Sequence, residues 1–438
     1  MQAQALPGFR DFYPEDFARR RHILDAWREV AQRYGFEEYD GPPLESLDLY
    51  TAKSGEEIVG QLYSFTDKGG REVALRPEMT PTLARMVAAR ARGLKKPIRW
   101  FSMPQLFRYE RQQRGRLREH FQLNCDLIGE ASPLADAEIV ALAIDVMRAL
   151  GLGSADVRVR ISDRRLIRAV IRELGFDPAH EAMAFSAIDK LDRREAGTAR
   201  AGLLGAGAQG ASVDSLAGLK EVRTWSVLEA RFPAVRAEAE PLRRAWSALE
   251  AMGFGDWLDL DLTIVRGLAY YTGTVFELFD AAQKFRAICG GGRYDDLLEV
   301  MGGEAMPALG FGMGDVVLAE LLQEKGLFRS GAGGLDGFLA AVTEADLPAA
   351  LGLARALRDV GLRVEYALSA TSLARQLKLA AARGARAAVL LGPDDRAAGA
   401  ATLREMSSGE QRRVALDRVA EELRGLRDAS IHRSTTAV

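Results

Sequence analysis

A glycine-rich segment, residues 325–337, constrains the fold of this 438-residue chain more than any other feature of its sequence. The run KGLFRSGAGGLDG holds five glycines in thirteen residues, a composition that favours a flexible linker over a helix or a strand. The stretches on its two sides are each long enough to bury a core of their own. The sequence therefore predicts two parts joined by a linker at 325–337.

Short apolar runs alternate with helix-patterned stretches in the part that follows the linker. The runs GFLAAV, RVEYAL, AAVLLG and RRVAL are interspersed with helical patterns over 345–359 and 371–384. Alternation of this kind predicts a compact α/β domain, which we place at 338–426. The last residues, 427–438, are polar and are expected to form a loose tail.

The longer first part, 1–324, mixes helices with strands. Residues 14–34 predict an amphipathic helix, because apolar residues recur at helical spacing and Gly35 follows its end. The next predictions are a hairpin over 61–66 and 71–76, a helix over 77–91, strands over 98–109 and 119–127, and a helix over 134–150. Residues 165–256 are mostly helical in pattern, and strands return from 258. We expect an α+β domain with a helical insertion at 165–256.

One glycine pattern inside the insertion satisfies GxGxxG, at Gly205, Gly207 and Gly210. A dinucleotide site would require a strand before these glycines and a βαβ frame around them. The residues that precede them are helix-like, so we interpret this run as a flexible connection.

Composition excludes several classes of protein. Lys and Arg number 59 and Asp and Glu 61, so the formal charge of −2 requires any polyanion to be held by a local basic patch. The two cysteines, Cys125 and Cys289, form no CxxC, which excludes a disulfide framework and a thiolate zinc site. The four histidines are scattered, so no metal site made by protein side chains is predicted. The N-terminus has no signal-peptide pattern and no stretch is apolar enough to span a membrane, which favours the cytoplasm.

Positive charge gathers between Arg85 and Arg118. This stretch holds eleven basic residues and a single acid, Glu110. Aromatic residues, among them Phe107 and Tyr109, are interleaved with the arginines on a predicted strand and turn. A run of like charge is usually a solvated surface, but this mixture is typical of phosphate recognition. We therefore predict a phosphate-binding segment here.

The strand over 119–127 carries polar and apolar residues in alternation. Period-two spacing puts its polar residues on one face and its apolar residues on the other. The polar set is His120, Gln122, Asn124 and Asp126. This face either lines a cleft or is the solvent-exposed side of an edge strand, and the alternation leaves both interpretations open.

Three further segments depart from the pattern of an ordinary core strand. Arg108 and Glu110 are in phase on the preceding strand, where an arginine and a carboxylate could hold a nucleotide from both ends. RGLAYYTGTVFE carries Arg266, a glycine and two tyrosines in place of alternating aliphatic residues. CGGGRYDD has three glycines, which allow a ligand to approach the backbone closely, although a glycine-rich turn without a ligand has the same composition.

These segments resemble a known family. LRPEMTPTLAR, FRYERQQRGRLREHFQLNCD, RGLAYYTGTVFE, GGGRYDDL and ALGFGMGDVVL occur in the order and at the rough spacing of the class II aminoacyl-tRNA synthetases. The third and fourth resemble the two signatures peculiar to the histidyl-tRNA synthetase family. The segment after the linker resembles the anticodon-binding domain of the histidyl, glycyl, threonyl and prolyl enzymes. The resemblance implies a class II antiparallel sheet flanked by helices, followed by an anticodon-binding-like α/β domain.

The resemblance also implies a set of histidine-binding residues. Glu78 and Thr80 match the pair that holds the α-amino group, with Gln122 beside them. Asp126 stands where the family usually has a glutamate that reads the imidazole, and Tyr271 matches the tyrosine partner of that glutamate. Tyr270 and Tyr294 belong to the same signatures and are assigned to the histidine pocket with them.

ATP-binding residues follow from the same comparison. Arg108 matches the arginine on the α-phosphate and Arg266 the family's second arginine there, and these two are the predicted catalytic residues. Glu110, Arg116 and His120 are assigned to ATP as well, with His120 where a phenylalanine commonly stacks on adenine. ATP is expected to arrive with Mg²⁺.

Two positions depart from the family pattern. The signature normally reads RGLDYY, and Ala269 replaces its aspartate. The third class II motif should end in an arginine that meets the terminal phosphates of ATP, but Val317 stands in that place. A valine cannot neutralise a phosphate, so the basic loop of Arg114, Arg116 and Arg118 is the expected substitute, with Arg116 preferred.

The resemblance implies a ligase that activates histidine as its adenylate and transfers it to tRNA(His). Residues 14–43, with Pro42, match the class II dimer motif, so a homodimer is expected. The alternative is a catalytically silent paralogue, like the regulatory subunit of ATP phosphoribosyltransferase. The missing arginine favours this alternative, whereas the anticodon-binding-like domain and the two phosphate arginines favour the ligase.

Overall fold

The computed structural model describes residues 4–51, 59–110, 115–191, 196–266, 270–328 and 334–435, with side chains as far as residue 429. Arg114 and Ala269, both singled out in the sequence, lie outside the described residues. The chain divides into two compact units, Met1–Phe328 and Arg329–Val438, and this boundary falls within the segment 325–337.

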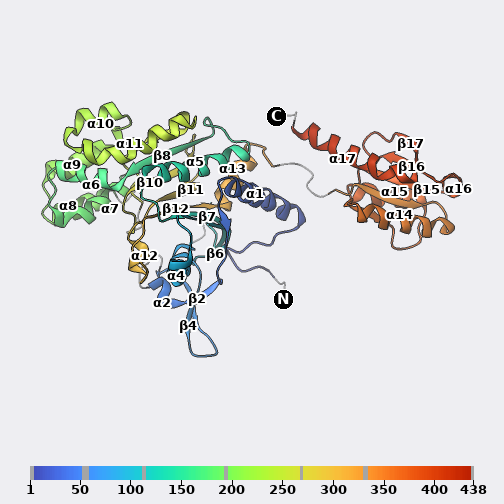
Figure 1. Ribbon diagram of the computed structural model, residues 1–438, viewed down its shortest axis with the longest axis horizontal. Coiled ribbons are helices and arrows are strands. Elements are labelled where there is room, and N and C mark those ends of the chain that lie inside the picture. Colours follow the sequence, from blue (N-terminus) through green and yellow to red (C-terminus); the bar gives the residue numbers. More distant parts are fainter. Residues whose placement is uncertain are drawn as a thin grey trace. The chain divides into compact units, whose positions relative to one another are not determined.

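A nine-stranded mixed sheet organises the first unit (Figure 1). Its order is β1 (Glu37–Glu38), β5 (Ile98–Ser102), β7 (Glu119–Ile128), β12 (Ala308–Gly314), β11 (Cys289–Arg293), β10 (Thr274–Asp280), β8 (Val157–Asp163) and β9 (Leu258–Leu260), with β6 (Gln105–Phe107) paired to β7. The six central strands from β5 to β8 pair antiparallel, and β1 and β9 add parallel edges. The sheet and its helices form the predicted α+β arrangement.

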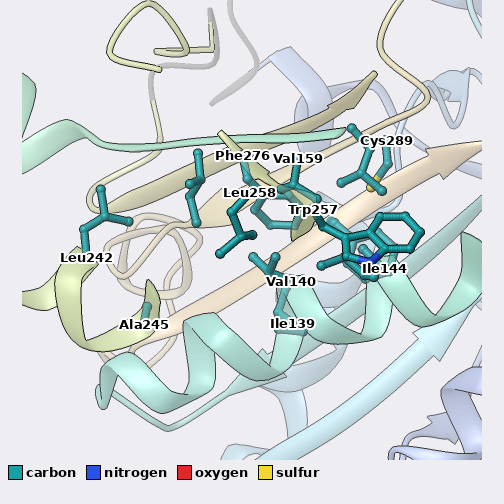
Figure 2. Close-up of a cluster of buried hydrophobic side chains, with 14 of the residues drawn as sticks. Ile139, Val140, Ile144, Val159, Leu242, Ala245, Trp257, Leu258, Phe276 and Cys289 are labelled. Atoms are coloured by element: carbon teal, nitrogen blue, oxygen red, sulfur yellow. The ribbon is translucent and has the colours of Figure 1, made fainter. Parts of the chain in front are cut away.

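Helices bury one face of this sheet. They are α1 (Pro14–Arg33), α5 (Pro133–Ala149), α6 (Arg164–Glu173), α11 (Arg236–Ala251) and α13 (Asp315–Glu324). The apolar half of β7, including Leu123 and Cys125, lies in this core, as its alternation predicted. Figure 2 shows Val140 and Ile144 of α5 gathered with Phe276 of β10 in the same layer. The polar half of β7 is thereby directed to the opposite face.

The opposite face is covered only in part. The covering elements are α2 (Leu47–Thr51), α4 (Thr80–Arg90), α12 (Leu297–Val300) and a small sheet of β2 (Leu44–Ser46), β4 (Glu72–Leu75) and β3 (Tyr63–Thr66). Leu83 and Val87 of α4 pack with Ile98, Ile128 and Val275 of the large sheet. This packing leaves the neighbouring stretch of β7, β11 and β12 available for a site.

The predicted strand over 98–109 is interrupted. β5 ends at Ser102 and β6 begins at Gln105, with Pro104 between them. Proline has no N–H to donate to a ladder, so the chain leaves β7 there and pairs again further along it. None of the described helices is long and apolar enough to cross a membrane.

The described part of the insertion is helical, as predicted. After α6 come α7 (Glu181–Asp189), α8 (Ala196–Gly205), α9 (Gly210–Ala217) and α10 (Trp225–Arg231), ahead of α11. The GxGxxG glycines lie at the junction of α8 and α9, and Gly207 has a φ of 94° in the turn. They connect two helices, so the βαβ frame of a dinucleotide site is not formed around them.

The second unit has its own five-stranded sheet. The order is β14 (Val364–Tyr366), β13 (Gly337–Ala341), β15 (Ala387–Leu391), β16 (Ala400–Glu405) and β17 (Gln411–Ala415), with α14 (Leu347–Asp359), α15 (Leu373–Ala382), α16 (Pro393–Ala397) and α17 (Val419–Thr435). β16 was not predicted. The expected loose tail at 427–438 needs correction, because α17 continues to Thr435 and Leu423 anchors this helix in the core of the unit.

Candidate active site

Four glycines on adjacent strands form a bare floor on the partly covered face of the sheet. Gly290 of β11 pairs with Gly312 of β12, and Gly292 of β11 pairs with Gly310. Because their positions alternate along the strands, all four face the same side. No side chain rises from this patch, so other side chains can lie directly on the backbone.

Each glycine makes room for one predicted site residue. A Cβ atom on Gly292 would come within 2.9 Å of the Tyr271 ring, and one on Gly312 within 2.7 Å of the Gln122 amide. A Cβ atom on Gly290 would overlap the Arg266 guanidinium, and one on Gly310 would overlap the Asp126 carboxylate. The glycines of β11 therefore make room for Arg266 and Tyr271, and those of β12 for Asp126 and Gln122, so these four side chains lie against the glycine floor.

A cavity of about 910 Å³ opens beside this floor. It collects six of the predicted site residues: Arg108, Glu110, Arg116, His120, Gln122 and Arg266. Ile188 and Asp189, at the end of α7, line it as well. The helical insertion thus contributes to the wall of the cavity, a role that its sequence pattern did not reveal.

The two predicted catalytic arginines are held from different sides. The Nε of Arg108 donates to the carbonyl of Pro77 at 2.9 Å, and the Nη1 of Arg266 lies 3.2 Å from a carboxylate oxygen of Glu277. Arg266 has a φ of 51°, in the left-handed region that non-glycine residues rarely occupy. Its Nε is buried and has no hydrogen-bond acceptor among the described residues. An arginine with a strained backbone and an unused donor is a suitable ligand for an anion.

Arg164 supports this unusual backbone. Its Nη1 donates to the carbonyl of Val265 at 2.9 Å and to the carbonyl of Arg266 at 3.2 Å. The guanidinium also stacks on Phe185 of α7, 4.5 Å from the ring centroid. Arg164 therefore links the insertion to the segment that carries Arg266.

His120 is neutral in this environment. Burial, followed by the positive charges of Arg108 and Arg10, lowers the pKa of His120 to about 3. A neutral imidazole adds no charge to the cavity and presents a flat aromatic face. This is the property that the predicted contact with adenine requires.

Asp126 and three tyrosines form the deep end of the site. The hydroxyl of Tyr294 donates a hydrogen bond to the Asp126 carboxylate, and both side chains are buried. The ring of Tyr270 lies 4.9 Å from that of Tyr271 and 5.9 Å from that of Tyr294, measured between centroids. Burial raises the pKa of Asp126 to about 7, and the bond from Tyr294 opposes this rise.

Glu78 and Thr80 lie at the start of α4. Glu78 is 6% exposed and Thr80 is the first residue of the helix. Burial first, and then neighbouring charges that include Glu78, raise the pKa values of Tyr270 and Tyr271. Glu78 therefore lies near the tyrosines, at the same end of the site as Asp126.

Sequence reasoning missed three residues around the site. The Tyr39 hydroxyl is buried without a hydrogen-bond partner among the described residues, and the charge of Asp126, after burial, raises the Tyr39 pKa. Arg160 and Arg286 line the cavity. In the sequence, the only signal for any of the three was the position of Arg286 shortly before the CGGGR run. Isolated arginines are common in this chain, so that position alone did not indicate a site residue.

Val317 also lines the cavity, in the first turn of α13. A Cβ atom on Gly115 would come 3.2 Å from the Cγ2 of Val317, so the basic loop passes directly over it. Arg116 follows in that loop and pairs with Glu110 at 3.0 Å. Arg118 instead stacks on Tyr109, 4.2 Å from the ring centroid. Of the two described arginines of this loop, Arg116 lines the cavity with Val317.

Comparison with known proteins gives one consistent family. Residues 8–315 match the family model described as Histidyl-tRNA synthetase, and residues 338–426 match the model described as Anticodon binding domain. The Histidine--tRNA ligase of Opitutus terrae is 43% identical over 95% of this chain and 97% of its own length. The chloroplastic/mitochondrial Histidine--tRNA ligase of Arabidopsis thaliana is 38% identical over 93% of this chain and 84% of its own. The crystal structure of histidyl-tRNA synthetase from Nostoc sp. PCC 7120 covers 97% of this chain and 99% of its own at 25% identity, with a TM-score of 0.83.

Proposed function

The chain belongs to the histidyl-tRNA synthetase family and is a histidine--tRNA ligase, and from this premise we propose how its cavity and glycine floor carry out the reaction. The observation that supports the assignment most strongly is the floor itself. It brings Arg266 and Gln122, on the wall of the cavity, into one layer with Asp126 and Tyr271 at the deep end. A nucleotide in the cavity and an amino acid at the deep end would then meet over the glycines.

In the activation step, a carboxylate oxygen of histidine attacks the α-phosphorus of ATP. The bond from that phosphorus to the bridging oxygen breaks, and pyrophosphate leaves with the bonding electrons. Arg108 and Arg266 neutralise the charge that develops on the α-phosphate, and positioning supplies most of the remaining rate enhancement. A tRNA 3′-terminal hydroxyl then attacks the carbonyl of the adenylate and AMP leaves.

ATP is proposed to occupy the cavity of about 910 Å³. His120 stacks on adenine as a neutral ring, and Glu110 and Arg116 contact the nucleotide from the basic loop. The described residues contain no cluster of three His, Cys, Asp or Glu side chains that could hold a metal ion. Mg²⁺ is therefore proposed to enter on the phosphates, which this ion prefers together with one or two carboxylates, and Glu110 and Glu277 are the glutamates on the cavity wall.

Histidine is proposed to bind at the deep end. Glu78, Thr80 and Gln122 hold its α-ammonium group, while Asp126 and Tyr271 take the two ring nitrogens. Tyr270 and Tyr294 complete the pocket, with Tyr294 positioning the Asp126 carboxylate. Buried polar groups of this kind reject amino acids that would leave them unpaired.

The remaining assignments extend this proposal beyond the cavity. Residues 338–426 bind the anticodon arm of tRNA(His), and their match to an anticodon-binding model supports this role. Two chains associate through 14–43, around Pro42. Both cysteines are free and buried, which suits the reducing environment of the cytoplasm.

The regulatory paralogue is the weaker explanation. The two reported relatives are named as ligases and align with at least 93% of this chain. The second matched model adds an anticodon-binding segment, which a subunit that does not charge tRNA has no need of.

ATP–pyrophosphate exchange tests the assignment. Exchange measured with each of the twenty amino acids should depend on histidine alone, and addition of tRNA should yield histidyl-tRNA. Exchange driven equally well by another amino acid would contradict the proposed pocket. Exchange that is absent with all twenty would instead support the regulatory paralogue.

A further inference from the structure

The cavity lacks the cation that the family's third motif would place on α13, because Val317 stands there. Pyrophosphate leaving the α-phosphorus carries the charge of both terminal phosphates, and a positioned donor near it is worth about 100-fold to 1,000-fold in rate. The cavity wall should therefore supply another arginine close to Val317. The arginines that line the cavity are Arg108, Arg116, Arg160, Arg266 and Arg286.

Three of these arginines are committed elsewhere. Arg108 and Arg266 are assigned to the α-phosphate. Arg160 stacks on Phe279, 4.7 Å from the ring centroid, and lies 3.7 Å from the buried carboxylate of Asp261. Arg116 and Arg286 are the candidates because their segments approach Val317, the basic loop through Gly115 and the loop before β11 through its pairing with Gly314.

Backbone pairing places Arg286 next to the first turn of α13. The amide of Gly314 donates to the carbonyl of Ile288 at 3.3 Å, directly before α13 begins. Arg286 precedes Ile288 by two residues, and Val317 follows Gly314 by three. Both side chains line the same cavity. The loop before β11 thus carries an arginine to the place where α13 carries a valine.

The loop that carries Arg286 is well fixed. The buried carboxylate of Asp280 accepts hydrogen bonds from the amides of Lys284 and Phe285, each at 2.9 Å. The side chain of Phe285 packs against the main core. Because Phe285 is partly buried against the core, the backbone at Arg286 is held beside the cavity although the Arg286 side chain is exposed, and a donor on a fixed backbone loses less entropy when it binds an anion.

We propose that Arg286 binds the β- and γ-phosphates of ATP and the departing pyrophosphate, in place of the arginine that the third motif lacks. The proposal rests on the activation reaction assigned above. Arg116, which approaches Val317 on the side of the basic loop, contacts the same phosphates from across the cavity. Together they replace one cation on a helix by two on loops.

Pyrophosphate exchange kinetics test this assignment, with the full-length protein and saturating histidine. Arg286→Ala should raise the KM values for ATP and for pyrophosphate by about 10-fold to 100-fold, as expected when a charged hydrogen bond is lost. The KM for histidine should stay within about twofold. Arg286→Lys should keep part of the affinity, because it retains the charge but not the fork geometry.

The matched control is Lys284→Ala. Lys284 lies in the same loop, two residues away, and pairs with Glu324 outside the cavity. This variant should exchange pyrophosphate like the parent. Restoring an arginine through Val317→Arg in the Arg286→Ala background should recover part of the lost affinity for ATP, because both positions serve the same phosphates.

Two results would overturn the proposal. One is an Arg286→Ala variant with unchanged KM values for ATP and pyrophosphate. The other is a rise in the KM for histidine as large as that for ATP, which would indicate general damage to the site. Absence of histidine-dependent exchange in the parent protein would overturn the assigned reaction and this inference with it, so the two failures are distinguishable.

Discussion

Tyr294 donates its hydroxyl proton in a hydrogen bond to the carboxylate of Asp126, a residue 168 positions earlier in the chain. Asp126 projects from β7 and lies over Gly310 of β12, while Tyr294 directly follows β11. Burial raises the pKa of Asp126 to about 7, so this carboxyl group is close to half protonated at neutral pH. Its protonation state therefore affects the stability of the fold and, in the proposed histidine pocket, the recognition of an imidazole.

Asp126→Asn should change how stability depends on pH. The pKa of about 7 in the folded protein lies above the ordinary value of 3.8, so between these pH values the folded chain holds a proton that the unfolded chain has released. The free energy of unfolding should fall as pH rises through this window, and Asp126 should contribute at least about 1 kcal/mol of that fall. Asparagine does not titrate and should remove this contribution. Melting temperatures of parent and variant at pH 5 and pH 8 measure it, and equal losses in the two proteins would contradict the raised pKa.

Tyr294→Phe should move the pH profile of histidine activation. The hydrogen bond from Tyr294 stabilises the charged carboxylate and so lowers the Asp126 pKa. Without it, the pKa should rise further, by on the order of one pH unit. The pH at which kcat/KM for histidine reaches half its maximum should increase accordingly. A profile that shifts to lower pH, or that stays in place, would show that this bond does not control Asp126.

Local patterns predicted the strands and helices well, but they could not predict which residues meet. Alternation along β7 placed Leu123 and Cys125 in the core, because period-two spacing is a property of the chain itself. The partner of Asp126 depends instead on the register between β7, β12 and β11. The resemblance pairs Tyr271 with Asp126 around the imidazole, which stays a prediction, but the hydrogen bond from Tyr294 to Asp126 could not be predicted from the sequence.

Contacts between distant segments account for the other omissions. Arg286 is a candidate phosphate ligand only because the segment before β11 lies beside the start of α13, a contact that the sequence does not reveal. In the same way, Arg10 from the N-terminal segment reaches both Glu119 of β7, through its Nε, and Asp315 of α13, at 2.9 Å. No spacing in the sequence relates these three residues, although both acids are buried and need the cation.

Gly310→Ala should impair histidine binding. A Cβ atom at this position would overlap both the Asp126 carboxylate and the backbone carbonyl of Cys125, and overpacking of this kind typically costs about 1 to 3 kcal/mol. Asp126 would have to leave the floor, so the KM for histidine should rise at least about 10-fold while the KM for ATP changes less. Gly352→Ala, in α14 with open space around it, is the control and should behave like the parent. An unchanged KM for histidine in Gly310→Ala would argue against the glycine floor.

Arg164→Ala should slow activation by acting through Arg266. The Arg164 guanidinium holds the carbonyls of Val265 and Arg266, and without it the strained conformation at Arg266 loses its support. Because Arg164 is a positioning residue, Arg164→Ala should lower kcat for exchange by about 10-fold and leave the KM for histidine nearly unchanged. Steady-state exchange kinetics separate the two quantities. A variant in which the KM for histidine rises and kcat is kept would contradict this role.

Removal of residues 329–438 should separate activation from tRNA charging. The first unit has its own core, and the second has a separate sheet and core around Leu339 and Val389. Histidine-dependent pyrophosphate exchange should therefore persist in the shortened protein, while aminoacylation of tRNA(His) falls by at least about 10-fold. Undiminished aminoacylation of tRNA(His) by the shortened protein would contradict the proposal that this unit binds the anticodon arm.

A charge reversal on α15 tests the same role in the intact chain. The segment 371–413 carries eight basic and four acidic residues, and Arg375 and Lys378 are exposed on one helix within it. Replacing both with glutamate should raise the KM for tRNA by about 10-fold and make it less dependent on salt, because phosphate contacts release counterions. Arg355→Glu on α14, also exposed, is the matched control, since it changes the charge of the unit away from α15. Because Arg355→Glu changes the charge half as much as the double replacement, an effect half as large on the logarithm of the KM for tRNA would mean that only the overall charge of the unit matters, and that α15 does not contact the tRNA.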